Sequence, residues 1–252
     1  MAGGTAKLPQ ALRTVCGRGG TINANETAGG ERRHDGRRDT PLHAMCGDRD
    51  EAAEMSIHSA HRDSASVRSI LRAATDTIHL SLHAAKPFAR IAARELDITG
   101  YTSLLRCLLN YHSSLTRMVE IACEELAMPA LADSADARRQ RLRRDLEDCA
   151  AEAETAPIEV AASISGAFAV GCFYTLMGSS LGGKIIHRQL DYLFDGLAGR
   201  RFFAGSHDDA AHWQSFCRAL ENYGTRSERV PCLGAGATFG FEHFSQCLED
   251  RL

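Results

Sequence analysis

The sequence predicts an all-α fold, a single-domain helical bundle, and three observations carry that prediction. Apolar residues recur at spacings of three and four over several long stretches, and this period places side chains on one face of a helix. No stretch of useful length alternates apolar with polar residues, as a half-buried strand would. Hydrophobic residues make up 44% of the 252 residues and charged residues 24%, a composition typical of a globular protein with a core.

Residues 1–60 differ from the rest of the chain. They carry clustered glycines and arginines (GRGG, AGGERRHDGRRD) and almost no aliphatic periodicity, so they cannot bury enough apolar surface to offset the entropy of ordering. We expect a disordered or non-native N-terminal extension, with Met55 as an alternative start, followed by one domain over 66–252. The basic cluster at 32–38 is interpreted as a solvated tail, and a net charge of -3 gives no general attraction for nucleic acid.

The first helix is expected from Ser66, with Asp63 or Ser64 as its cap. A second helix is predicted over 99–126, then a linker containing ADSADA, and a third, charged helix over 135–151. We expect six to eight helices in total. The stripe of the first helix consists of Val67, Ile70, Leu71, Ala74, Ile78 and Leu82.

Pro157 is expected to open a long apolar helix that meets GSSLGG at 178–183 and resumes as KIIHRQLDYLF. The uncharged part of this helix, 160–178, is only weakly hydrophobic, so we interpret it as a buried central helix and not as a membrane span. Ser206 and Asp209 predict a capping box. The last helix is expected to carry Phe239, Phe241, Phe244 and Leu248.

The nine cysteines are odd in number and form no CxxC pair, so we interpret them as reduced thiols rather than zinc ligands or disulfides. This usage favours a reducing compartment such as the cytoplasm. Four of them lie in apolar patterns and are expected in the core: Cys107, Cys123, Cys172 and Cys217.

The glycine string at 178–183 is the strongest single signal. Three glycines within six residues of one helix cost about 1 kcal/mol each relative to alanine. Either another helix packs closely there, or the backbone approaches a flat, bulky ligand. The glycines alone do not distinguish these interpretations.

His79 follows Ile78 at the edge of the apolar stripe of the first helix. A lone histidine there is usually a partly buried structural residue. However, Arg72 lies two turns earlier on nearly the same face, and iron in a porphyrin takes an imidazole ligand while its propionates attract cations. His83, one turn later, is a rival ligand.

Two segments together resemble the heme oxygenases. LRAATDTIHLSLH (71–83) is similar to their proximal helix, in which a threonine precedes the heme-ligating histidine by four residues, as Thr75 precedes His79. GCFYTLMGSSLGGKIIHRQL (171–190) is similar to their distal helix, especially in bacterial members associated with biliverdin supply to phytochromes. Supporting segments are GYTSLLRCLLNYHSSL, RRQRLRRDLEDC, and RFFAG followed by HWQSF. The resemblance covers 66–252.

The resemblance implies a bundle in which heme is sandwiched between a proximal and a kinked distal helix. His79 would be the iron ligand, and Arg72 would pair with a propionate. Heme would be both cofactor and substrate, cleaved with O₂ and reducing equivalents to biliverdin, CO and ferrous iron. The distal face would be lined by Gly178, Ser179, Gly182 and Gly183, and further heme-binding positions would be Thr75, Tyr174, Lys184 and Arg188.

The resemblance also implies partners: an electron donor such as ferredoxin or a flavin reductase, and a bacteriophytochrome as biliverdin acceptor. Three positions depart from the family pattern. Ser179 stands where many members have aspartate, although the bacterial members also have serine there. Met177 stands where the bacterial members usually have glutamate, and His83 where some members have a glutamate reaching the proximal imidazole. These departures keep a second hypothesis open, a non-catalytic heme carrier or sensor. A third is a helical enzyme without heme.

Overall fold

The protein is known here from a computed structural model, which describes residues 65–153 and 164–249. Within these ranges the chain forms nine α-helices and two short 3-10 helices, with no strand. The predicted all-α class is confirmed, with one α-helix more than the upper end of the expected number. The extension predicted over 1–60 lies outside the described residues. No described helix is both long enough and apolar enough to cross a bilayer.

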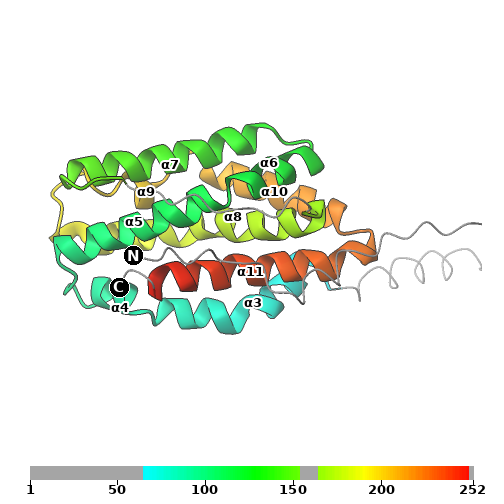
Figure 1. Ribbon diagram of the computed structural model, residues 1–252, viewed down its shortest axis with the longest axis horizontal. Coiled ribbons are helices and arrows are strands. Elements are labelled where there is room, and N and C mark those ends of the chain that lie inside the picture. The colour runs from blue at the N-terminus through cyan, green and yellow to red at the C-terminus, as the bar shows by residue number, and fades with distance from the viewer. Residues whose placement is uncertain (1–64, 154–163, 250–252) are drawn as a thin grey trace, which may run out of the picture. The chain divides into compact units, whose positions relative to one another are not determined.

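Helix α8 runs through the middle of the bundle (Figure 1). In this view α7 lies on one side of α8, and α11 and α3 lie on the other. The elements, in chain order, are α3 (Val67–His83), α4 (Lys86–Ala92), α5 (Ile98–Ser114), α6 (Thr116–Glu125), α7 (Ala130–Asp148), α8 (Gly166–Gln189), η1 (Leu190–Tyr192), α9 (Arg201–Ala204), α10 (Asp209–Tyr223), η2 (Ser227–Arg229) and α11 (Val230–Glu249).

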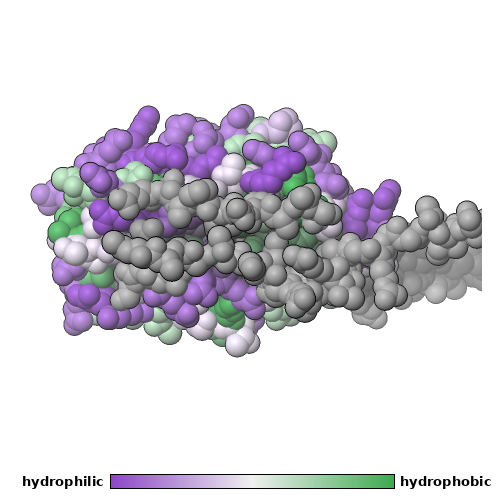
Figure 2. Space-filling model, viewed as in Figure 1, coloured by the Kyte–Doolittle hydropathy of each residue, from purple (hydrophilic) through white to green (hydrophobic). Residues whose placement is uncertain are grey.

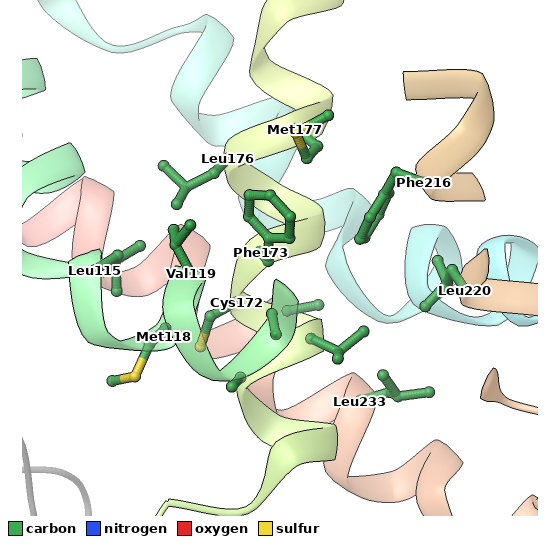
Figure 3. Packing of buried hydrophobic residues seen from close by; sticks show 14 of the residues in the cluster. Leu115, Met118, Val119, Cys172, Phe173, Leu176, Met177, Phe216, Leu220 and Leu233 are labelled. Carbon is green, nitrogen blue, oxygen red and sulfur yellow. The ribbon is translucent and has the colours of Figure 1, made fainter. Parts of the chain in front are cut away.

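The first half of α8 is the centre of the core. Phe173 is fully buried and meets Phe216 of α10 edge to face, with ring centroids 5.3 Å apart. Met118 and Val119 of α6 and Leu233 of α11 belong to the same core cluster (Figure 3). A second apolar cluster lies around Tyr101 and Phe203. The four cysteines expected in the core are all buried, and no described cysteine forms a disulfide.

Glycines bring α8 and α11 into unusually close contact. A Cβ at Gly171 would lie 2.1 Å from the Leu233 carbonyl oxygen, and a Cβ at Gly236 would lie 2.1 Å from that of Phe168. These contacts are made by backbone atoms, which cannot turn away as a side chain can. The close packing fixes the position of α8, and therefore of the glycine string further along it.

The start of α3 is tied to α10. Ser66 caps the helix by accepting a hydrogen bond from the Ser69 amide at 3.2 Å. The amides of Val67 and Arg68 donate to the Glu221 carboxylate at 2.8 and 3.1 Å, so an anion from α10 satisfies the positive end of the α3 dipole. The predicted caps, residues 63 and 64, lie outside the described residues.

Two predicted boundaries were wrong. The helix expected over 99–126 divides at Leu115 into α5 and α6, because Ser114 and Thr116 turn their hydroxyls back onto the carbonyls of Tyr111 and Ser113 and compete with the helical pattern. The ADSADA segment expected as a linker lies inside α7, whose first turn carries Asp133, an acidic residue favourable at a helix N-terminus. Helix α4 was not predicted.

The long apolar helix α8 begins at Gly166, where the Ser165 side chain accepts from the Phe168 amide. Pro157, the predicted start, lies outside the described residues. Every residue of the glycine string at 178–183 is helical, so the kink predicted there is not a break in the helix. The capping box at α10 forms in part: the Ser206 amide donates to Asp209 at 2.9 Å, while the Ser206 hydroxyl accepts from the Asp208 amide at 3.3 Å.

Candidate active site

His79 lies on the exposed side of α3. Its ring meets the His83 ring at a centroid distance of 4.6 Å and the half-buried Phe241 ring of α11 at 5.5 Å. Partial burial lowers the pKa of His79 below its ordinary value, and His83 and Arg72 act in the same direction while Asp76 opposes them. The imidazole is therefore neutral near pH 7 and can offer a ring nitrogen lone pair to a metal.

Arg72 and Arg68 on α3 act electrostatically on Tyr174 of α8. Burial raises the pKa of the Tyr174 phenol on α8, and Cys217 adds to that rise, while Arg68 and Arg72 oppose it by favouring the phenolate. Such opposition requires both guanidinium groups to lie near Tyr174. Arg68 also hydrogen-bonds the Cys217 thiol of α10. Sequence reasoning found Arg72 but missed Arg68, which precedes it by one helical turn.

One face of α8 is uncovered. Gly178, Leu181, Gly182 and Ile185 share this face, because their spacings are those of neighbours on a helix surface. Leu181 and Ile185 are each 55% exposed, and a Cβ built on Gly182 meets nothing within 4 Å. A Cβ built on Gly178 would have the Trp213 ring as its nearest neighbour, 3.7 Å away. We call these four residues the open face of α8; it is apolar and lacks side chains at the two glycines.

Trp213 closes one end of this open face. Its ring packs against Tyr174 at 5.8 Å and stacks on Phe216 at 5.9 Å, so its position is set by the core beneath it. The sequence placed Trp213 in the supporting segment HWQSF but gave it no role at the site, because its place beside Gly178 depends on how α10 packs against α8.

Two residues predicted to line the ligand have packing roles instead. A Cβ at Gly183 would lie 3.0 Å from the Phe203 carbonyl oxygen, so this glycine admits α9 against α8. Thr75 is buried, and its hydroxyl donates to the Leu71 carbonyl at 2.9 Å within its own helix. Both were predicted from their places in a motif, and both face neighbouring parts of the protein.

Ser179 and Met177 lie on either side of Gly178. Ser179 is exposed and donates its hydroxyl proton to the Leu176 carbonyl at 2.7 Å. The buried Arg138 donates to the same carbonyl at 2.8 Å. Met177 is only 1% exposed and packs in the core near Phe216 (Figure 3), so its thioether belongs to the core and not to the open face.

Two of the remaining predicted site residues are cationic, and the rival ligand His83 lies beside His79. Lys184 and Arg188 are both exposed on the last turns of α8, and neither has an ion pair with a described residue. His83 is exposed and touches His79 with its ring edge. The site therefore combines one neutral imidazole, an open apolar face and four cations, Arg68, Arg72, Lys184 and Arg188.

Comparison with protein-family models matches residues 65–250 to the family described as heme oxygenase. The chain belongs to the heme oxygenase family. As a member it is an oxidoreductase that degrades heme, and heme is its substrate. No curated protein matches the chain.

Two solved structures share the fold. The NO- and CO-bound heme oxygenase from Neisseria meningitidis is 21% identical, with a TM-score of 0.59, over 75% of this chain and 92% of that one. The heme oxygenase from Leptospira interrogans is 16% identical, with a TM-score of 0.57, over 74% of this chain and 100% of that one. At these identities the likeness concerns the fold, and the roles of individual residues must come from the chain itself.

The side chains present fit heme. A porphyrin needs an axial donor, and His79 supplies a neutral imidazole. It needs apolar contact close to its plane, and the open face of α8 supplies two exposed aliphatic side chains and a glycine with free space above it. Its propionates need cations at one edge, and Arg68 and Arg72 lie on α3 near Tyr174.

Proposed function

We propose that His79 ligates the heme iron and that the opposite face of the porphyrin lies on the open face of α8. The observation that carries the proposal is the open face itself: an apolar strip that no described residue covers, in which a Cβ built on Gly182 would meet nothing within 4 Å. An uncovered strip of this kind is unfavourable in water and becomes favourable once a flat apolar ligand covers it.

Arg72 and Arg68 bind the propionates in this proposal, and Lys184 and Arg188 supply further positive charge. Guanidinium groups form charge-assisted, two-pronged hydrogen bonds with carboxylates. Trp213 limits how far the porphyrin can move along α8, because its ring lies 3.7 Å from where a Cβ at Gly178 would be. Together the cations and the indole would set the rotation of the heme, and therefore which meso carbon faces the glycines.

Heme supplies the iron on which O₂ is bound and reduced, and the protein orients it and controls the distal surroundings. Gly178 and Gly182 leave room for a small ligand between the helix backbone and the porphyrin. The Ser179 hydroxyl proton is held by the Leu176 carbonyl, so the oxygen of Ser179 presents lone pairs and can orient a water as acceptor.

The products of this reaction are biliverdin, CO and ferrous iron. The reducing equivalents come from a ferredoxin or a flavin reductase, and a bacteriophytochrome accepts the biliverdin. That none of the described cysteines forms a disulfide supports a reducing compartment, the cytoplasm.

The ligand assignment is tested by adding hemin to the full chain and to His79→Ala and His83→Ala. We expect the wild type and His83→Ala to give an iron–imidazole spectrum, and His79→Ala to lose it and regain it with added imidazole. A normal spectrum for His79→Ala, or its loss in His83→Ala alone, contradicts the proposal. Addition of a reductant and O₂ should then convert the Soret band of the wild type into biliverdin absorption.

The distal surface is tested by Gly182→Leu with Gly234→Leu as the matched control. Both glycines are helical and both have open space where a Cβ would lie, so the two variants should fold equally well. We expect only Gly182→Leu to weaken hemin binding, because its side chain fills the open face of α8. Equal hemin affinity in the two variants would place the heme elsewhere.

A further inference from the structure

A hollow of about 380 Å³ lies on α7. Its lining comes from α7, from α9 and from the segments on either side of α9, and no residue of α3 or α8 takes part. The edge of the molecule over α7 is strongly hydrophilic (Figure 2). The side chains that matter are Gln140, Arg141, Arg144, Arg201 and Leu197.

The arginines of this hollow differ in how far they are already bonded. Arg201 is paired with Asp148 and lies 3.5 Å from the buried Asp145. Arg141 is only 18% exposed, yet its closest carboxylate oxygen, on Asp209, is 4.0 Å away, and its buried Nε has no hydrogen-bond partner. Arg144 donates no hydrogen bond to any described residue. Two guanidinium groups therefore retain most of their donors.

The local charge balance is positive. Asp209 is shared between Arg141 and the buried Arg138, whose Nη2 lies 3.6 Å from it. Among the described residues, Arg144 has no carboxylate within the 4.0 Å of an ion pair. A mostly buried guanidinium with unsatisfied donors is costly, and an anion in the hollow would satisfy donors and charge together.

We propose that this hollow binds a small molecule bearing phosphate or carboxylate groups. Arg141 and Arg144 lie one turn apart on α7, so both guanidinium groups can donate bidentate hydrogen bonds to the oxygens of the ligand. The Gln140 amide also lines the hollow. The exposed Leu197 side chain supplies an apolar contact at the rim. The concave shape and its volume favour a small anion over the flat surface of an acidic protein.

The test uses the full chain, with and without hemin, and inorganic pyrophosphate and citrate as probes in isothermal titration calorimetry at constant ionic strength. We expect saturable binding of at least one probe, weakened at least about tenfold by Arg141→Gln and by Arg144→Gln. Arg143→Gln is the matched control, because Arg143 is an exposed arginine on the same helix that does not line the hollow. Circular dichroism and thermal unfolding check the fold of each variant.

Any of four results would overturn the proposal. Neither probe binds, Arg143→Gln weakens binding as much as the other two variants, or binding vanishes at physiological salt. The fourth is binding of an acidic polypeptide that all three substitutions weaken equally, which would identify an exposed protein-binding surface. Hemin binding should stay unchanged in all three variants, so the outcome is independent of the heme site.

Discussion

Gly236→Ala tests the close packing of α8 against α11, which positions the open face. The new Cβ would lie 2.1 Å from the Phe168 carbonyl oxygen, whereas an unstrained contact needs about 3.5 Å, so the helices must separate locally by about 1.4 Å. Overpacking costs about 1–3 kcal/mol, and we expect the top of that range because the blocking atoms are backbone. Alanine regains about 1 kcal/mol of helix propensity, which leaves a net loss of about 2 kcal/mol.

Gly234→Ala is the control for this prediction, because Gly234 lies on the same helix and its Cβ would meet nothing within 4 Å. It should gain up to about 1 kcal/mol from helix propensity alone, so the two variants should differ by about 3 kcal/mol in free energy of unfolding. At about 2–4 °C per kcal/mol for a domain of this size, their melting temperatures should differ by about 6–12 °C.

Urea unfolding and calorimetry measure this difference, and hemin titration adds a functional readout. Phe241, which supports the His79 ring, lies on the same helix, so Gly236→Ala should also weaken hemin binding while Gly234→Ala does not. If the two variants unfold within about 0.5 kcal/mol of each other, the reasoning from close packing is refuted.

Three further predictions concern the rest of the bundle. Glu221→Gln should lose about 1 kcal/mol and speed hydrogen exchange in the first turn of α3, where the carboxylate accepts two amides; unchanged exchange would contradict this. Burial lowers the pKa of His112 to about 3, below its unfolded value, so stability is full above about pH 6.5 and falls below it, by about 2 kcal/mol at pH 5; denaturant titration of His112→Phe should show a flatter profile, and an unchanged one would count against it. Met177→Glu should destabilise by about 3 kcal/mol or more, because it buries an unpaired carboxylate, whereas Met177→Leu should cost less than about 1.5 kcal/mol; similar melting temperatures for the two would show that Met177 is not in the core.

Helices that bury one apolar face could be predicted from the sequence, because apolar residues spaced three to four apart are a local property of the chain. The stripe containing Leu71 and Leu82 became α3, and both residues are buried. The break at Leu115 was not predictable from the apolar pattern over 99–126, because Leu115 is itself buried and continues that pattern. It results from hydroxyl-to-carbonyl bonds on either side, which depend on geometry that the hydrophobic pattern does not encode.

The candidate site was predictable to the extent that it lies on single helices. His79 and Arg72 could be proposed from the sequence because they share α3, and the glycines because they cluster within α8. Trp213 and Arg68 could not, since their place beside Gly178 and Tyr174 depends on the packing of helices that are distant in sequence. Resemblance to a family supplied motif positions, but it did not separate glycines with open space beside them from glycines packed against the protein.

Gly182 and Gly183 make that distinction clear. The open space beside Gly182 gives the protein no packing reason to exclude a side chain there. At Gly183, by contrast, an added Cβ would lie 3.0 Å from the Phe203 carbonyl oxygen, which is a tight contact. The two interpretations left open by the glycine string, close packing and close approach of a ligand, therefore apply to adjacent residues. A helix tolerates the propensity cost of about 1 kcal/mol per glycine when each one removes a different steric conflict. At Gly183 the conflict is with α9, and at Gly182 we infer that it is with heme.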